Sequence, residues 1–226
     1  ANNIVNDGDG VFSLGANVRL NTSGANSFDS VTTFATVSLD SLSTVRFDGA
    51  AQNIPGFTYG TVELYSDGNK TAVGDFICKK DFARTANDPV FYDGGFSHKV
   101  KGHWQLSQTY TTAASMTGRV EFNGANQNIS ASYFEKVIFS GSGTKTMNGS
   151  INVDDSFDIK SGVSLDANIY SINSAGHFVV RNSAAFSQVA SGSTIFDGSG
   201  VQVLTFDGTG SFYNLTLSKT FGTSLV

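Results

Sequence analysis

Carboxylates are the side chains of this chain that could most readily do chemistry, because two of them can act as general acid and base on a glycosidic bond. Asp154 and Asp155 are adjacent, so in a strand they would point to opposite faces. Asp48, Asn123 and Asp197 each precede a glycine at equivalent places of a sequence repeat, which is typical of turn residues. We therefore expect no catalytic site, no enzymatic activity and no cofactor.

Two further patterns resemble metal ligands only in part. Residues 6–10, Asn-Asp-Gly-Asp-Gly, resemble part of a calcium loop, but Val5 stands where the first carboxylate belongs and no downstream Glu completes the shell. His98 and His103 are five positions apart and would face opposite sides of a continuous strand. We expect no metal site, and we interpret the first pattern as a turn and the histidines as surface residues.

The charge balance argues against nucleic acid as a partner, and the distribution of apolar residues argues against membrane insertion. The 226 residues include 14 Lys and Arg against 19 Asp and Glu, a net charge of −5, and the basic residues form no run. Phosphate backbones require clustered cations, so nucleic acid is not an expected partner. No apolar stretch approaches the roughly 18 residues of a membrane-spanning segment, so we expect no membrane insertion.

Aromatic residues indicate the secondary structure. Nineteen Phe and seven Tyr are spread through a background rich in Gly, Ser, Thr and Asn, which is typical of half-buried strands and not of helices. The single cysteine, Cys78, excludes an internal disulfide, and it aligns with Val153 in the repeat described next. We therefore expect an all-β chain in which the Cys78 thiol is buried and unreactive.

A sequence repeat of about 75 residues runs along the chain. The pattern Phe-Asp/Asn-Gly followed by Gln occurs in residues 45–54, 120–129 and 194–203. The spacing is 75 positions from Phe47 to Phe122 and 74 from Phe122 to Phe196. We divide the chain into a degenerate N-terminal part of a repeat (1–42), repeat 1 (43–115), repeat 2 (116–192) and a truncated repeat 3 (193–226). Because the third copy stops partway, we expect the chain to be part of a longer polypeptide.

Two architectures fit this repeat. In a parallel β-solenoid the strands stack as rungs, and one repeat would make about three turns of roughly 20 to 30 residues. In tandem β-sandwiches each repeat would be one domain, but the repeat is short for a sandwich of about 100 residues. We favour the solenoid, in which equivalent Phe and Asn side chains form ladders. We expect segments 43–82 and 116–157 to share one strand layout, with Phe47 and Phe122 both buried.

A stretch that interrupts the repeat is the candidate for ligand contact. Residues 83–98 have no close equivalent in the next repeat, and binding residues lie disproportionately on loops. Phe91 and Tyr92 lie within it and are our candidate binding residues, as a platform for sugar rings. Trp104 is instead an expected core residue, because Phe178 takes its place in the next repeat.

The motif Phe-Asp/Asn-Gly-x-x-Gln-x-Ile of the first two copies, with Phe-Tyr-Asn-Leu-Thr-Leu at residues 212–217, resembles repeats of large cell-surface adhesins of gliding, Bacteroidetes-type bacteria. The resemblance covers about residues 43–226. It implies an extracellular, cell-surface protein exported by type 9 secretion, whose partners are outer-membrane secretion and anchoring machinery and surface glycans or solid surfaces. No counterpart of the sorting domain of such proteins follows Leu217.

These observations lead to two alternative functions. We interpret the chain as a structural stalk or spacer segment of a secreted bacterial adhesin, with loops that carry any surface or glycan contact. The alternative is a polysaccharide-active β-helix enzyme, a lyase or a glycoside hydrolase, which would need a linear cleft lined by two or more carboxylates.

The resemblance also implies a covalent modification. Related bacteria attach glycans to Ser or Thr in Asp-Ser/Thr-apolar triplets of exported proteins, and Ser30, Ser41 and, as a looser match, Ser156 lie in such triplets. A glycan there would shield strand edges and solubilise a weakly charged surface, which requires an exposed hydroxyl.

Overall fold

The computed structural model describes residues 10–24, 36–106, 116–219 and 226. These residues form strands and connecting turns, with no helix among them. The chain comprises two compact units, Ala1–Gln105 and Leu106–Val226. In each unit the strands pair in parallel and stack as rungs. The fold is thus the all-β parallel solenoid that the sequence favoured over tandem sandwiches.

The described residues of the first unit form three sheets and one short strand pair. The strands are β1 (Val11–Leu14), β2 (Arg19–Thr22), β3 (Thr36–Leu39), β4 (Thr44–Phe47), β5 (Gln52–Ile54), β6 (Thr58–Tyr59), β7 (Thr61–Leu64), β8 (Gly68–Ala72), β9 (Phe76–Cys78), β10 (Phe82–Arg84), β11 (Pro89–Tyr92), β12 (Ser97–Val100) and β13 (Trp104–Gln105). The sheets have the orders β2-β4-β7-β10-β13, β5-β8-β11 and β6-β9-β12, and β1 pairs with β3. The chain visits the three sheets in turn. One rung advances by 17 positions from Val45 to Val62, by 20 from Val62 to Phe82 and by 22 from Phe82 to Trp104.

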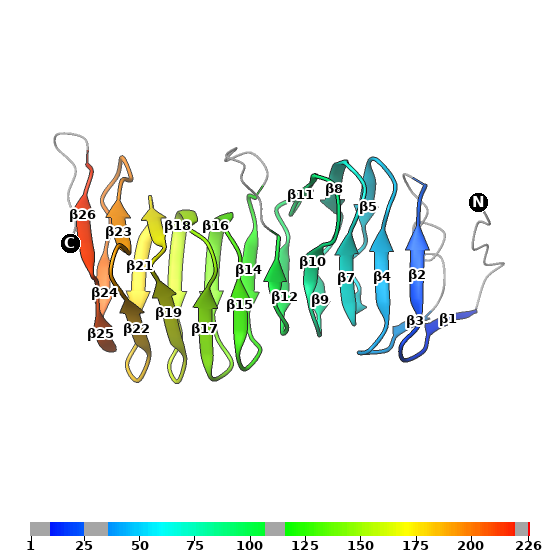
Figure 1. Cartoon of the computed structure of the whole chain (residues 1–226), viewed down its shortest axis with the longest axis horizontal. Helices are drawn as coiled ribbons and strands as arrows, with labels where there is room; N and C mark the ends of the chain where they lie inside the picture. The colour runs from blue at the N-terminus through cyan, green and yellow to red at the C-terminus, as the bar shows by residue number, and fades with distance from the viewer. Residues whose placement is uncertain (1–9, 25–35, 107–115, 220–225) are drawn as a thin grey trace. The chain divides into compact units, whose positions relative to one another are not determined.

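The second unit repeats this plan with longer strands. Its strands are β14 (Arg119–Phe122), β15 (Gln127–Ile129), β16 (Ser132–Phe139), β17 (Thr144–Met147), β18 (Ile151–Ile159), β19 (Ser164–Asn168), β20 (Ser171–Ser174), β21 (His177–Val180), β22 (Ala185–Gln188), β23 (Ser193–Phe196), β24 (Leu204–Phe206), β25 (Thr209–Ser211) and β26 (Asn214–Leu217). Figure 1 shows them as successive arrows, from green to red.

Three sheets can be distinguished in the second unit. The first sheet has the order β15-β17-β19-β22-β25. The second sheet contains the first halves of β16 and β18 with β20, β23 and β26. The third sheet contains β14, the second halves of β16 and β18, β21 and β24. A register shift between Phe134 and Lys136 separates the two halves of β16.

Aromatic ladders fill the interior of each unit. Side chains alternate along the strands, so the inward residues of neighbouring rungs lie directly over one another. In the second unit Phe157 and Phe178 are register partners, and their ring centroids stack at 4.2 Å. In the first unit Phe82 and Trp104 stack at 5.0 Å in the same manner. The predicted ladders and the burial of Trp104 are confirmed.

The strand layouts of repeats 1 and 2 agree only in part. Phe47 and Phe122 are both fully buried, as predicted. Shifted by 75 positions, β4, β5 and β8 overlie β14, β15 and β17, but β6 and β7 correspond to the single strand β16, and β9 and β10 to β18. The expectation of equal strand numbers is therefore wrong. At Gly60 the chain passes so close to the preceding rung that a Cβ would lie 2.3 Å from the Ser43 carbonyl oxygen, whereas Glu135 takes this place in repeat 2, beside the register shift.

The sequence repeat and the rungs have different periods. In the second unit Phe122 lies on β14 in the third sheet, and that sheet is reached again at β16, β18, β21 and β24. Phe196, which is 74 positions after Phe122, lies on β23 in the second sheet. One repeat therefore ends one sheet short of four full rungs.

The rungs also vary in length more than the repeat suggested. A rung of the second unit advances by 17 positions from Val120 to Val137 and by 26 from Phe178 to Leu204. The shortest rungs thus fall below the range of roughly 20 to 30 that we expected for a solenoid turn.

Residues 83–98 do not interrupt the solenoid. They form most of a regular rung, with β11 paired to β8 and β12 paired to β9. The expectation of an irregular loop is wrong, because the extra residues extend this rung to 22 positions without breaking its ladder.

Candidate functional site

The motif shared by the three repeats forms a corner that is closed by a glutamine. In each copy the glycine N–H donates to the glutamine Oε1, at 2.7 Å (Gly49 to Gln52), 2.9 Å (Gly124 to Gln127) and 3.1 Å (Gly198 to Gln202). The Gln52 Nε2 donates to the carbonyl oxygens of Thr22 and Gly24 on the preceding rung, and Gln202 bonds the rung before it in the same way. These bonds satisfy backbone groups at a corner, where the ladder is interrupted.

A lysine on the following rung closes each corner from the other side. Lys145 Nζ donates to the carbonyl oxygens of Gly124 at 2.5 Å and Ala125 at 2.7 Å. Lys70 and Lys219 bond the equivalent corner carbonyls in their copies. Sequence reasoning recognised the turn but assigned no role to its lysine. The signal that could have identified it is its recurrence after 75 and 74 positions.

Carbonyl oxygens, which carry no net charge, surround the Lys145 ammonium. Lys145 has no exposed surface, and burial lowers its pKa to about 8. Burial lowers the pKa of Lys70 as well, although Asp48 and Asp67 act in the opposite direction. Because the Lys145 ammonium donates to three carbonyls, we interpret this group as a structural cap on the corner.

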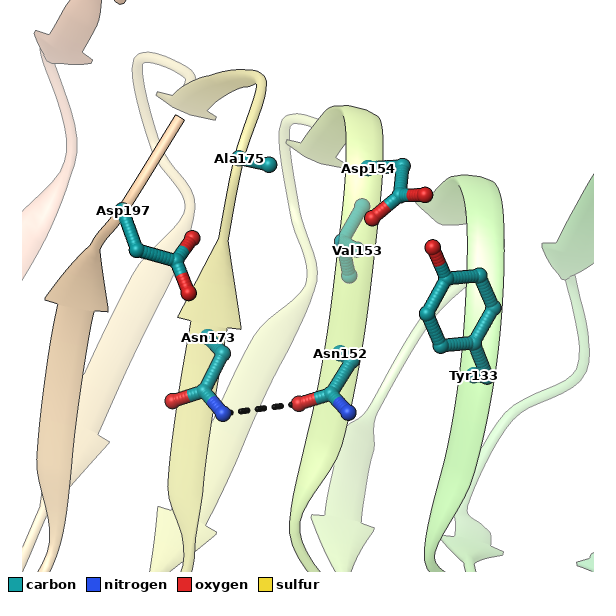
Figure 2. A pocket seen from close by; sticks show the side chains of 7 residues that line it. All are labelled: Tyr133, Asn152, Val153, Asp154, Asn173, Ala175 and Asp197. Carbon is teal, nitrogen blue, oxygen red and sulfur yellow. Dashed lines mark hydrogen bonds between the residues drawn. The ribbon is translucent and has the colours of Figure 1, made fainter. Parts of the chain in front are cut away.

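A surface hollow of about 270 Å³ lies on the second sheet of the second unit (Figure 2). It is lined by Tyr133, Asn152, Val153, Asp154, Asn173, Ala175 and Asp197. These residues come from β16, β18, β20 and the positions directly after β20 and β23, and therefore from four successive rungs.

One row of the hollow is a ladder of polar side chains. Tyr133, Asn152 and Asn173 are register partners on adjacent strands and lie on the outward face of the sheet. The Asn173 Nδ2 donates to the Asn152 Oδ1 at 2.8 Å, as Figure 2 shows. This bond is the Asn ladder that the sequence predicted.

The second row consists of Asp154, Ala175 and Asp197. Each follows one member of a register trio, Val153, Ser174 and Phe196, so the three residues lie on adjacent rungs. Neighbouring strands are about 4.8 Å apart, which puts the Asp154 and Asp197 backbones about 10 Å apart. The hollow forms because Ala175, between them, fills little space.

The two carboxylates interact across this gap. Burial raises the pKa of Asp154, and the charge of Asp197 raises it further. Asp155 points elsewhere and forms an ion pair with Lys136 at 3.0 Å. Asp154 and Asp155 are not on opposite faces as expected, because β18 has three outward residues in succession between the inward Val153 and Phe157.

The predicted aromatic platform is not formed as expected. Phe91 has no exposed surface, and its ring packs at 4.9 Å from Phe82 and 6.1 Å from Trp104. Its assignment as a binding residue is wrong, because alternation along β11 turns it into the core. Tyr92, the next residue of β11, is partly exposed and remains a predicted contact.

The candidate glycosylation sites remain predictions. Ser41 and Ser156 are both partly exposed. Ser30 lies outside the described residues.

The single cysteine and one histidine belong to the core. Cys78 is fully buried as predicted, and burial raises the pKa of its thiol to about 12. His98 is not a surface residue, because its ring stacks on Phe76 at 3.9 Å and its Nε2 lies 3.1 Å from the Asp93 carbonyl oxygen. Burial lowers the pKa of His98. His103 is partly exposed.

Residues 6–10, the partial calcium loop, lie outside the described residues. Within the part of the chain that the structure describes, no group of three or more His, Cys, Asp or Glu is placed to hold a metal ion. None of the described residues forms a helix with the length and apolar character needed to cross a membrane. Comparisons with family models, curated proteins and solved structures gave no match.

Proposed function

We propose that the chain is a structural spacer segment of a secreted bacterial surface adhesin. The observation that carries this proposal is that the polar residues conserved between the repeats bond the backbone of the solenoid itself. In all three copies the recurring Gln and Lys side chains bond backbone groups of a corner. What the repeat preserves is therefore the stacking of rungs, which is the property that a spacer needs.

The setting of this spacer follows from the adhesin-like repeat motif. We propose an extracellular location at the cell surface after type 9 secretion, with outer-membrane anchoring machinery and surface glycans or solid surfaces as partners. The weakly charged surface, with 15% charged residues, suits the glycans proposed for Ser30, Ser41 and Ser156.

The experiment that tests this proposal uses the source organism. Intact cells are treated with an external protease, and the chain is followed with an antibody against residues 116–219. A surface spacer is degraded while a cytoplasmic marker protein survives. In-frame deletion of the chain is expected to reduce attachment of the cells to glass or glycan-coated beads. Protection of the chain in intact cells, or unchanged attachment after deletion, contradicts the role.

A polysaccharide-active enzyme is the second candidate, and one observation favours it. Asp154 and Asp197 flank Ala175 in the hollow. Most glycoside hydrolases use a pair of carboxylates that lie on either side of the scissile bond. Incubation with a polysaccharide panel, followed by a reducing-end assay and by absorbance of unsaturated products, distinguishes the candidates. The spacer is expected to release no product, whereas release that is lost in Asp154→Asn establishes the enzyme.

A further inference from the structure

The hollow on the second sheet combines charged acceptors, amides and a phenol ring over four rungs. We propose that it is a binding site for a short stretch of a polysaccharide, whose hydroxyl groups donate to Asp154 and Asp197 while the Asn152–Asn173 pair forms the polar floor. This inference does not rest on the spacer role, and it requires no bond cleavage.

The shape of the hollow supports a ligand the size of a sugar ring. Asp154 and Asp197 come from rungs two strand spacings apart, and the methyl group of Ala175 is the only side chain of that row between them. Each carboxylate can therefore approach the ligand from one side. Hydrogen bonds to an ionised acceptor are about twice as strong as neutral ones, which favours a ligand with several hydroxyl donors.

One unsatisfied atom points to the same chemistry. The Asn173 Oδ1 is buried and has no hydrogen-bond partner among the described residues, although its Nδ2 is bonded to Asn152. Buried polar atoms are rarely left without a partner. A rotation of the Asn173 amide would bring this acceptor to the surface of the hollow, where a ligand hydroxyl can donate to it. Tyr133 completes the hollow at its β16 side and provides an aromatic face for the C–H groups of a sugar (Figure 2).

The same groups suit a hard cation less well. Calcium takes six to eight oxygen ligands, usually with several carboxylates, whereas the hollow has two carboxylates, one on each side of Ala175. The raised pKa of Asp154 also weakens a cation site, because the group must be ionised to bind a metal.

The test is a titration followed by amide chemical shifts in the ¹⁵N-labelled chain. The probes are maltose, cellobiose and lactose in separate experiments, with calcium chloride as a fourth. We expect at least one disaccharide to shift the amides of Asn152, Asn173 and Ala175, with a dissociation constant of about 1 mM, as befits a small, shallow site.

Two alanines provide a matched pair of variants. Ala175→Leu fills the hollow and is expected to weaken disaccharide binding at least tenfold, the loss that corresponds to about 1.4 kcal/mol. Ala185→Leu makes the same change on β22 of the first sheet, where Ala185 is also outward and partly exposed, and is expected to leave binding unchanged. Asp197→Asn, which keeps the shape of the side chain, is expected to weaken binding by about tenfold because a charged acceptor is lost.

Three results would overturn the proposal. These are the absence of any shift with all three disaccharides, equal binding by wild type and Ala175→Leu, and calcium-induced shifts in the hollow without disaccharide shifts. The last result would identify a cation site. If Ala175→Leu does not fold, as judged from its amide spectrum, Asp197→Asn decides, and unchanged disaccharide affinity in that variant rejects the site.

Discussion

Replacing Lys145 by Met tests whether the repeated lysine stabilises the corner of the solenoid. Met keeps the apolar stem but has no donor, so the carbonyl oxygens of Gly124, Ala125 and Ser142 lose their bonds to Nζ. A hydrogen bond contributes about 1 kcal/mol net, or about 3 kcal/mol for the three. The larger cost of a buried acceptor without a partner does not apply, because Gly124 keeps its bond from the Ser142 N–H and Ala125 and Ser142 are exposed residues. Part of the loss of these three bonds is offset because a desolvated charge is also removed. We expect the variant to be less stable than wild type by about 2 kcal/mol at pH 7.

The pH dependence of this difference has a definite sign. Burial lowers the pKa of Lys145 from 10.5 to about 8, so between these values the unfolded chain binds more protons than the folded chain. The stability of wild type therefore contains a contribution that rises with pH in this window, and the variant lacks it. The difference in unfolding free energy between wild type and Lys145→Met should grow from pH 8 to pH 10.

Urea unfolding at a series of pH values, followed by far-UV circular dichroism, measures this difference. Lys70→Met is the matched control, because Asp48 and Asp67 counteract the effect of burial on Lys70 and its pH dependence should be smaller. A difference in unfolding free energy that shrinks as the pH rises would refute the reasoning. It would mean that the three carbonyl oxygens around Lys145 favour its ammonium over the neutral amine. A variant as stable as wild type at pH 7 would show that the corner does not need the lysine.

Further predictions concern the core, the rung spacing and the thiol. Phe122→Ala should lower the unfolding free energy by about 3 to 5 kcal/mol in urea, because it opens a cavity in a column of fully buried rings. Gly176→Ala should prevent the close approach of neighbouring rungs and lower the melting temperature strongly, because its Cβ would lie 1.7 Å from the Asp155 carbonyl oxygen. Gly200→Ala is the control and should melt like wild type, because no atom lies within 4 Å of the added Cβ. Cys78 should react slowly with a maleimide in buffer and rapidly in urea, and fast labelling of the native chain would contradict its burial.

The sequence predicted the class of fold because its strongest signals are periodic. The recurrence of Phe47 as Phe122 and the strand alternation after it require no knowledge of distant contacts. Both residues are buried, as the repeat implies. The corners were less predictable, because Gly60 and Glu135 occupy the same repeat position and yet end a strand in one copy and continue it in the other.

The candidate site could not be predicted for a related reason. Asp154 and Asp197 are 43 positions apart, and they come together only because two successive rungs, of 21 and 22 positions, place Ala175 between them. The spacing of the repeat does not reveal the lengths of its rungs, so nothing in the sequence pairs these carboxylates. Phe91 was misassigned because a longer rung resembles an inserted loop in the sequence. Only its pairing with β8 shows that the segment around Phe91 belongs to a regular rung.

The mismatch between repeat and rung has a consequence for how such a chain can evolve. A duplicated repeat in the second unit begins one sheet earlier than its parent, so each new copy would present its outward side chains on a different sheet from its parent. Duplication would thus distribute any surface feature around the axis, and three copies would pass before one direction recurs. A hollow such as that at Ala175 would not be multiplied into a continuous track on one side by this route. Selection for a one-sided track would instead favour a repeat made of a whole number of rungs.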